Sequence, residues 1–490
     1  MDYSGFVGPA YTVQSLSADC QRCVNLYPQT DESGAGKSRA ILLSTPGLVR
    51  LADVSGTATG GVRGTYTASN DRFFAVVGAY LFELSSTWNI LGTYALPGET
   101  GIGQVSLTDN GQDMMIATGP NAYWFNFTAN TLTQVTDAVF FGATTCGFID
   151  GYIVFNQPNT QIFWITNLYS TVINPLGFAS AEGNPDNLLS LLVDHREIWL
   201  FGDVSTEVWY DSGGANFPFS FIQGAFISHG IAAPFSAARL DNTTFWLGND
   251  EFGRGIVWRA NGYAPIRVST FALEQAIQRY PTITDAVAWT YQQDGHSFYV
   301  LNFPSGDATW VYDAASGLWH ERGYLGTLTA NDGQLHRGRP QTHSFAFGKH
   351  VVGDWQTGYL YSLDATIAED DGRAIKFLRA APFINNENKR IFFHQFQLAM
   401  EVGQGNPGGD GPPPAAPADP QISLRWSDDG GYTWSNYQTV SMGVSGAYTT
   451  RVIWRRLGQS RQRVFEVSTG QDAIPLKMFA AYLELEGVNS

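Results

Sequence analysis

The feature that most constrains the fold is a hairpin pattern in residues 194–213, DHREIWLFGDVSTEVWYDSG. Ile198 and Leu200 fall on one side of an extended chain, and the residues between them fall on the other. A short polar turn follows, and residues 207–210 form a second apolar run. Alternation at period two, with β-branched and aromatic residues interrupted by Gly and Asp, predicts two antiparallel strands.

The same hairpin pattern recurs along most of the chain. Its copies lie at residues 71–84, 114–125, 152–165, 194–213, 244–259, 297–312 and 344–361. A spacing of roughly 40 to 50 residues is typical of propeller blades. The sequence therefore predicts an all-β fold with a β-propeller over residues 46–372. Seven blades are favoured, and six are the alternative because the copy at 344–361 is the least regular.

The pattern changes after residue 372, where longer strands replace the short hairpins. Runs at 391–400, 422–426, 449–454, 463–467 and 477–485 predict a C-terminal β-sandwich domain over residues 373–490. Residues 403–420 form a Pro/Gly loop that cannot fold by itself.

Two segments do not follow the blade pattern. Residues 1–45 are interpreted as an N-terminal arm, either partly ordered or docked on a neighbouring subunit, and residues 40–52 as a strand, a turn and a strand. Residues 269–280 predict one inserted short helix that ends before Pro281. Its apolar face would carry Phe271, Leu273, Ala276 and Ile277.

The composition narrows the class of protein. Gly (53 residues) and aromatic residues (14%) are frequent and charged residues (15%) are few, which favours turn-rich β-structure. No apolar run has the roughly 18 residues of a membrane helix, and the first residues resemble no secretory signal. Three cysteines cannot form a disulfide framework. We therefore expect assembly in a reducing host cytoplasm and no membrane insertion.

The charge argues against a conventional nucleic-acid-binding protein. The net charge is −16, whereas such a protein carries a basic face. Residues 375–490 hold 11 Lys and Arg against 10 Asp and Glu, which leaves 17 basic and 34 acidic residues in 1–374. The propeller part is therefore acidic, and the C-terminal part is close to neutral.

Three short motifs resemble known ligand sites but lack their context. GAGKS at 34–38 imitates a phosphate-binding loop without the preceding strand. Cys20 and Cys23 form a CxxC without further zinc ligands nearby, so we interpret them as incidental thiols. His336, His343 and His350 are spaced by seven residues, but Pro340 argues against a shared helix face. No metal, cofactor-binding or catalytic residue is predicted from these motifs.

Residues 427–434, SDDGGYTW, match the Asp-box pattern of sialidase-type hairpin turns. In this interpretation Ser427 opens the motif, Asp429 accepts backbone N–H bonds across the turn, Gly431 supplies an unusual dihedral, and Trp434 packs beneath. These roles are structural. Asp428 and Asp429 are adjacent in an extended chain, so they cannot face one substrate as an acid/base pair.

Residues 451–463, RVIWRRLGQSRQR, carry five arginines and no acid. Such a run is a solvated rim, a contact to an anionic surface of a neighbouring subunit, or a DNA-phosphate contact. We select Arg451, Arg455 and Arg456 as candidate subunit or partner contacts.

Taken in order, these features resemble the packaged-DNA stabilisation proteins of short-tailed bacteriophages, which are tail-hub or nozzle subunits. The resemblance rests on CVNLYP at 23–28, STPGL at 44–48, AEGNPD at 181–186, the helix near 271–280, WSDDG at 426–430 and VIWRRLG at 452–458. The loop at 403–420 is an insertion relative to that pattern.

The resemblance implies a structural virion protein in the phage tail. It implies a homohexamer that extends the DNA channel below the portal, retains the packaged genome until ejection, and contacts the tail adaptor, the needle or plug, and the tailspikes or fibres. Double-stranded DNA would pass through without sequence-specific binding. No enzyme activity and no cofactor are expected. The alternatives are a propeller-type glycosidase or carbohydrate-binding virion protein, and a general interaction propeller.

Overall fold

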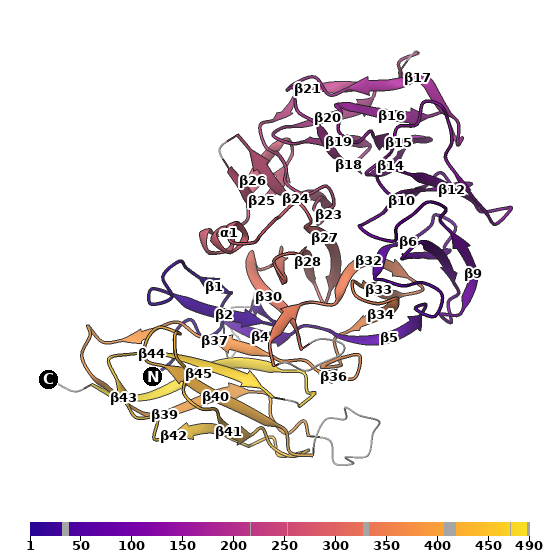
Figure 1. Ribbon diagram of the computed structural model, residues 1–490. Coiled ribbons are helices and arrows are strands. Elements are labelled where there is room, and N and C mark those ends of the chain that lie inside the picture. The colour runs from indigo at the N-terminus through magenta and orange to yellow at the C-terminus, as the bar shows by residue number, and fades with distance from the viewer. Residues whose placement is uncertain are drawn as a thin grey trace.

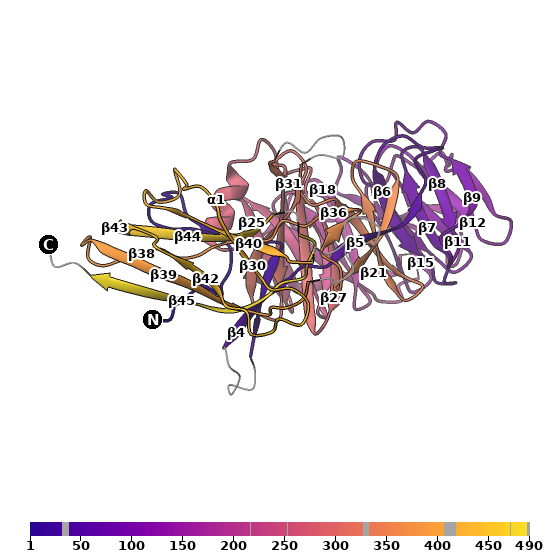
Figure 2. The same cartoon turned by 90° about the horizontal axis from the view of Figure 1, so that it is seen from below.

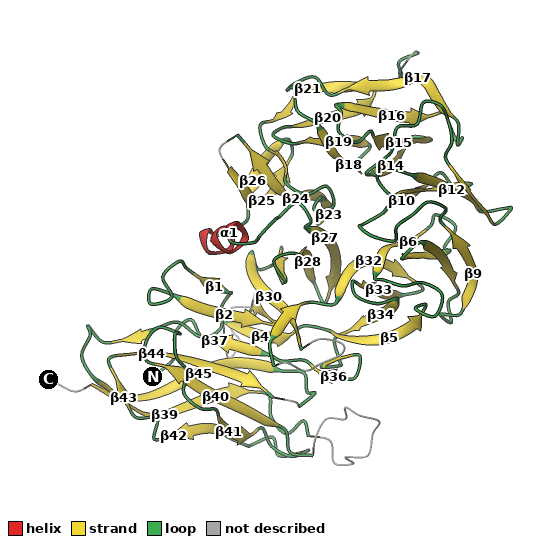
Figure 3. Cartoon of the chain, viewed as in Figure 1, coloured by secondary structure: helices red, strands yellow, loops and turns green. Residues whose placement is uncertain are grey.

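The computed structural model describes residues 1–31, 39–215, 217–251, 253–326, 333–405, 418–470 and 472–487. Strands and turns make up almost all of these residues, and Figure 3 shows one short helix among them. The strands form a ring of sheets that is joined at one side to two larger sheets (Figure 1). The prediction of an all-β propeller followed by a β-sandwich is therefore confirmed.

Each of the first four blades is a four-stranded antiparallel sheet. Their strands are β6 (Val62–Thr67), β7 (Phe73–Val77), β8 (Tyr80–Leu84) and β9 (Ile90–Ala95); β10 (Ser106–Asp109), β11 (Asp113–Ala117), β12 (Ala122–Asn126) and β13 (Thr131–Gln134); β14 (Cys146–Ile149), β15 (Tyr152–Asn156), β16 (Ile162–Thr166) and β17 (Ile173–Ser180); and β18 (Leu188–Asp194), β19 (Glu197–Gly202), β20 (Thr206–Asp211) and β21 (Phe219–Ile227).

The last three blades have extra strands. Blade 5 contains β22 (Gly230–Ile231), β23 (Ala238–Leu240), β24 (Thr243–Asp250), β25 (Gly253–Asn261) and β26 (Ala264–Arg267). Blade 6 contains β27 (Val287–Gln293), β28 (His296–Phe303), β29 (Ala308–Asp313) and β30 (Leu318–Leu325), with β31 (Leu335–Arg337) paired to β30. Blade 7 contains β32 (Pro340–Ala346), β33 (Lys349–Asp354), β34 (Tyr359–Asp364), β5 (Gly47–Asp53), β35 (Glu369–Asp370) and β36 (Arg373–Ala374). Seven blades, the favoured number, are therefore present.

The ring is closed by β5, which comes before all the other blade strands in the chain. It pairs antiparallel with β34, so the first propeller strand completes the last blade. Leu48 of β5 packs with Tyr361 of β34 and Val352 of β33 in one buried cluster. A break in the ring would therefore separate strands that are more than 300 residues apart in sequence.

The predicted hairpins are the two middle strands of blades 1 to 6, such as β19 with β20. In blade 7 the predicted pairing is wrong. Residues 344–346 belong to the inner strand β32, whereas β34 pairs with β33, which the sequence analysis missed. A tight turn at Phe347 and Gly348, both with positive φ, separates β32 from β33. The predicted run ends in this turn, and the strand that follows it was omitted from the prediction.

Two sheets pack face to face to form the sandwich. One contains β3 (Leu26–Thr30), β4 (Ala40–Ser44), β45 (Lys477–Gly487), β39 (Ile391–Met400), β42 (Val452–Arg455) and β43 (Gln459–Ser460). The other contains β1 (Tyr11–Thr12), β2 (Cys20–Val24), β37 (Leu378–Ala380), β38 (Ile384–Asn385), β44 (Gln462–Thr469), β40 (Gln421–Ser427) and β41 (Gln438–Ser441). Phe396 and Phe465 meet between the sheets with ring centroids 5.1 Å apart.

The propeller and the sandwich share a sheet. Val24 of β2 pairs in parallel with Glu321 of β30, and β2 also pairs with β37. Blade 6 therefore continues through β2 into one sandwich sheet, and Figures 1 and 2 show the sandwich beside this part of the ring. The guanidinium of Arg22 adds a bidentate ion pair to Glu321, with contacts of 2.7 and 3.1 Å.

Residues 1–45 contribute strands to the sandwich sheets. β3 and β4 form a hairpin, and β4 pairs with β45. The strand–turn–strand prediction for residues 40–52 is wrong in one respect, because β4 and β5 lie in different sheets. Residues 45 and 46 carry the chain from the sandwich to blade 7. The division of the chain at 45 and 372 remains a proposal.

The helix α1 (Phe271–Gln278) lies at the outside of blade 5, and its N-terminus is capped by the Thr270 hydroxyl. Leu273 and Ile277 are buried as predicted, but Phe271 is exposed and lies against the Arg267 guanidinium. Phe271 occupies the first helical position, before the apolar face begins. No helix in the described part of the chain has the length and apolarity to cross a membrane.

Candidate functional sites in the propeller cavity and on the sandwich

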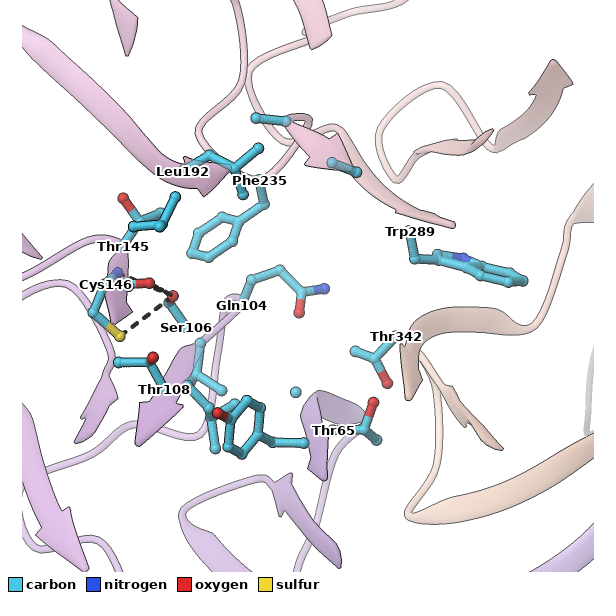
Figure 4. Close-up of a pocket in the computed structure, with 18 of the residues that line it drawn as sticks. Thr65, Gln104, Ser106, Thr108, Thr145, Cys146, Leu192, Phe235, Trp289 and Thr342 are labelled. Carbon is cyan, nitrogen blue, oxygen red and sulfur yellow. Dashed lines mark hydrogen bonds between the residues drawn. The ribbon is translucent and has the colours of Figure 1, made fainter. Parts of the chain in front are cut away.

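A cavity of about 850 Å³ lies at the centre of the propeller. The inner strands of all seven blades line it, namely β6, β10, β14, β18, β23, β27 and β32. Threonine, serine and glutamine side chains and the aromatic side chains of Phe235 and Trp289 surround the opening (Figure 4). No local sequence pattern identifies these residues, because each blade contributes only a few and their proximity depends on closure of the ring.

Hydrogen bonds join each blade to both of its neighbours. The bonds run from Val105 N to Arg63 O, Cys146 N to Ser106 Oγ, Leu191 N to Thr145 Oγ1, Ser190 Oγ to Pro234 O, Ala288 N to Phe235 O, Asn302 Nδ2 to Pro340 O, and Thr67 Oγ1 to Phe345 O. Every pair of adjacent blades is thus bonded directly. The cavity wall is a closed, cross-linked ring.

Charged groups in the cavity wall are mostly paired with other residues. Arg63 is buried and bonds Glu99. Asp109, the one carboxylate among the described wall residues, accepts bonds from Tyr66 and Ser69. A glycosidase requires two carboxyl groups that flank one bond. The described wall does not supply such a pair.

His343 lies at the edge of the cavity, and its Nε2 lies 3.0 Å from Nδ1 of His350. The Trp289 ring stacks on His343, and Tyr291 contacts both imidazoles. Burial, and then the neighbouring His350, lowers the pKa of His343 to about 3. At neutral pH this pair is uncharged, and it packs within blade 7 against Trp289 and Tyr291 of blade 6.

The third histidine of the seven-residue spacing lies elsewhere. His336 is on β31 and contacts Asp307 at 2.7 Å. Within the described residues, no three His, Cys, Asp or Glu side chains gather as metal ligands. The prediction of no metal site stays a prediction. The GAGKS segment at 34–38 lies outside the described residues.

The CxxC cysteines are buried in β2 as free thiols. Burial raises the pKa of Cys20 to about 11 and that of Cys23 to about 12. Thiols with such values are poor nucleophiles at neutral pH. The Cys23 thiol lies 3.1 Å from the carbonyl oxygen of Leu26 and packs in the sandwich core.

The Asp-box residues form a tight turn between β40 and β41. The Asp429 carboxylate accepts bonds from Thr433 N at 2.9 Å and from the Ser427 hydroxyl at 2.7 Å. Gly431 has φ +93°, a region that favours glycine. Trp434 donates from Nε1 to the carbonyl of Gly431 at 3.1 Å. Hydrogen bonds, chiefly from Thr433, lower the pKa of Asp429 to about 2.

The neighbouring Asp428 points to a different partner. Its carboxylate accepts two bonds from the Arg463 guanidinium, at 2.6 and 2.8 Å. Arg463 is almost fully buried and lies over the Phe393 ring. It is therefore a core residue, so a solvent-exposed rim is the wrong interpretation for this member of the arginine run.

The other arginines of the run lie at the surface. Arg451, Arg455 and Arg456 are exposed at or beside β42, an edge strand of its sheet. Arg451 donates to the Gln397 side chain at 2.7 Å. The backbone N–H of Arg456, at φ +60°, bonds the His394 carbonyl. Charged side chains on an edge strand also discourage unwanted strand pairing.

Arg379 on β37 was missed by the sequence analysis. Its guanidinium is fully buried, and no carboxylate among the described residues forms an ion pair with it. It donates to the carbonyl oxygens of Gly5, Phe6, Pro9 and Arg22 and to Oε1 of Gln21. No local pattern marks such a residue, because its acceptors lie more than 350 positions away.

Two protein-family models match the chain in succession. The model described as Bacteriophage P22 Gp10, beta-propeller, matches residues 19–368. The model described as Bacteriophage P22 Gp10, beta-sandwich, matches residues 376–486. No curated protein matches the chain.

Proposed function

Because the chain belongs to the family of the phage P22 Gp10 packaged-DNA stabilisation proteins, we propose that it is a tail-hub subunit whose copies form a ring below the portal and its adaptor. The coarse function, a structural protein of the phage tail, follows from the family. In our proposal six copies extend the DNA channel, retain the packaged genome, and anchor tailspikes or fibres. The main support for this proposal is that the two family matches cover the propeller and the sandwich in the same order as in the chain.

The architecture supports a load-bearing role. Strand β2 joins blade 6 to the sandwich by backbone hydrogen bonds, and the Arg22–Glu321 ion pair lies at the same junction. Adjacent blades of the propeller are hydrogen-bonded to one another around the whole ring. Such a subunit resists separation of its two parts better than domains joined by a flexible linker would.

The charge supports a conduit that lets DNA slide. Residues 1–374 hold twice as many acidic as basic residues. An acidic wall repels phosphates, whereas a basic wall would bind them through counterion release and hold the duplex. Sequence-specific contacts are not part of the proposal.

The exposed arginines at β42 are proposed as contacts to the next subunit or to a tail partner. Arg455 and Arg456 are exposed and adjacent at the end of an edge strand, and Arg451 lies at its other end. Planar guanidinium groups suit bidentate pairing with carboxylates, which the acidic propeller of a neighbouring copy offers. The Asp-box residues Ser427, Asp429, Gly431 and Trp434 keep a structural role in this proposal.

Native mass spectrometry of the purified full chain, followed by projection imaging, tests the ring. A closed assembly of six copies with a central opening is the expected result. A monomer at micromolar concentration would contradict the proposal unless the adaptor induces assembly. The same measurements are therefore repeated with the purified adaptor, and a monomer there as well would reject the ring.

A further inference from the structure

Five polar atoms in the wall of the propeller cavity have no hydrogen-bond partner among the described residues. They are Oγ1 of Thr65, Nε2 of Gln104, Nδ2 of Asn110, Nε1 of Trp289 and Oγ1 of Thr342. Trp289 is 6% exposed and Thr342 is 8% exposed. Leaving a buried donor unpaired costs free energy, so unpaired groups in an otherwise well-bonded wall suggest a missing partner.

These five residues lie on one side of the ring. Trp289 belongs to blade 6, Thr342 to blade 7 and Thr65 to blade 1. Gln104 precedes the inner strand of blade 2, and Asn110 follows it. Four consecutive blades thus supply the unpaired groups, two of which come from blade 2. Figure 4 shows Gln104, Trp289, Thr342 and Thr65 around the same open space.

Other hydroxyls of the wall are already used to join the blades. Ser106, Thr145 and Ser190 each bond an adjacent inner strand. The contrast separates the wall into a bonded part and an unpaired part. The unpaired part is therefore the one in which hydrogen-bonding capacity is left unused.

The unpaired groups are uncharged, and aromatic rings lie beside them. The Phe235 ring extends into the space in which the Gln104 amide lies (Figure 4). His343 beside Trp289 is neutral at pH 7, since burial lowers its pKa to about 3. Arg239 brings one exposed positive charge to the wall. Neutral hydrogen-bonding groups next to aromatic faces match a ligand with several hydroxyl groups and an apolar C–H face.

We propose that the central cavity of the propeller binds an uncharged mono- or disaccharide. Its hydroxyl and ring oxygens would bond Gln104, Thr342 and Thr65, and its C–H face would pack on Phe235. The volume of about 850 Å³ is within the usual range for small-ligand sites. This proposal concerns binding alone, and it stands or falls independently of the hexameric ring.

The test is a titration of the full-length chain with glucose, galactose, N-acetylglucosamine, maltose and cellobiose. Isothermal calorimetry measures affinity, and saturation-transfer NMR identifies the sugar protons in contact. We expect at least one sugar to bind with a Kd of about 1 mM or lower. Gln104→Leu should weaken this binding about tenfold or more, because it removes the amide at similar volume.

The matched control is Gln134→Leu, on the exposed outer strand of the same blade. It should leave sugar affinity unchanged. If Gln104→Leu fails to fold, Thr342→Val provides a variant of the same shape. The absence of binding by every sugar would reject the proposal and indicate a cavity filled with solvent. Binding that neither variant weakens, or tighter binding of glucuronate than of glucose, would also overturn it.

Discussion

Arg379 donates a hydrogen bond from Nε to the carbonyl oxygen of Phe6 over 2.6 Å, although 373 positions separate the two residues. The other nitrogens of this guanidinium bond Gly5, Pro9 and Gln21. One buried side chain thereby holds the first residues of the chain against the sandwich. This contact argues against an N-terminal arm that extends freely toward a neighbouring subunit.

The Arg379→Met variant should release the first 22 residues. It removes charge-assisted hydrogen bonds of about 1.5–3 kcal/mol each and leaves several carbonyl oxygens unpaired, so we expect a loss of about 3 kcal/mol or more. Hydrogen–deuterium exchange should increase in residues 1–24. The control is Arg390→Met at an exposed position. Unchanged exchange near Phe6 in Arg379→Met would contradict this role.

The sequence predicted the hairpins, whose strands are close together in the chain. It did not predict the pairings between strands that are far apart in the chain. The middle strands of blades 1 to 6 are buried hairpins with short turns, so alternation and turn residues revealed them. The pairing of β5 with β34 leaves no local pattern, because each strand alone resembles any other short apolar strand. The same reasoning explains why strands of residues 1–45 were not assigned to the sandwich.

The candidate sites also fall into those encoded in one short segment and those assembled from distant segments. The Asp-box turn is encoded within eight residues, and its hydrogen bonds follow from that motif. The propeller cavity is assembled from seven distant segments. The hydrogen bonds of Arg379 join two distant segments. The burial of Arg463 was also missed, since its partner Asp428 lies 35 positions away.

Closure of the ring predicts a large effect for Leu48→Ala. Leu48 is buried between β5 and the last blade, and truncation of such a leucine costs about 2–5 kcal/mol. The midpoint of urea unfolding should fall accordingly. Leu91→Ala removes a leucine that is 63% exposed, and a change within about 0.5 kcal/mol is expected. Equal midpoints for the two variants would show that β5 does not stabilise the closed ring.

Asp429→Ala should loosen the turn at residues 427–434 and change no hydrolytic activity. The pKa of Asp429 is lowered to about 2 by hydrogen bonds, so its stabilising effect is present above the ordinary pKa of 3.8 and is lost as pH falls towards 2. Hydrogen exchange of the Thr433 amide in the wild type and the variant at pH 7 measures the loosening of the turn. The same measurement on the wild type at pH 2.5 measures the loss of stabilisation in acid. Hydrolysis of a sialoside by the wild type that disappears in this variant would favour a glycosidase.

The paired histidines predict a loss of stability in mild acid. The pKa of His343 is about 3 in the folded chain and about 6.5 when unfolded, so the unfolded state binds more protons between these values. Stability should therefore fall as pH decreases below about 6.5, by up to ~1.4 kcal/mol per pH unit from this site.

Thermal midpoints at pH 7 and pH 4.5 measure this effect. The difference between the two should be smaller in His343→Gln, which keeps a polar side chain without the titration. The exposed His394 provides the control substitution His394→Gln, which should keep the wild-type difference. The same pH dependence in the wild type and in both variants would show that a group other than His343 causes the loss of stability in acid.

The arginines at β42 give the last prediction. Replacement of Arg451, Arg455 and Arg456 by Glu should weaken assembly at least tenfold, because it places negative charge opposite an acidic partner surface. All three are exposed, so the monomer should keep its thermal midpoint. Mass photometry over a range of protein concentrations measures the assembly constant.

An assay of DNA binding distinguishes arginine contacts to protein from arginine contacts to DNA phosphate. If the arginines contact phosphate, wild-type protein should shift duplex DNA in gels with a steep dependence on salt, and the triple variant should lose the shift while its assembly stays intact. If they contact protein, the wild type should bind DNA weakly at physiological salt, because residues 1–374 carry an excess of acidic groups. The second outcome is the one we expect, and tight salt-dependent binding would make this edge strand a DNA contact.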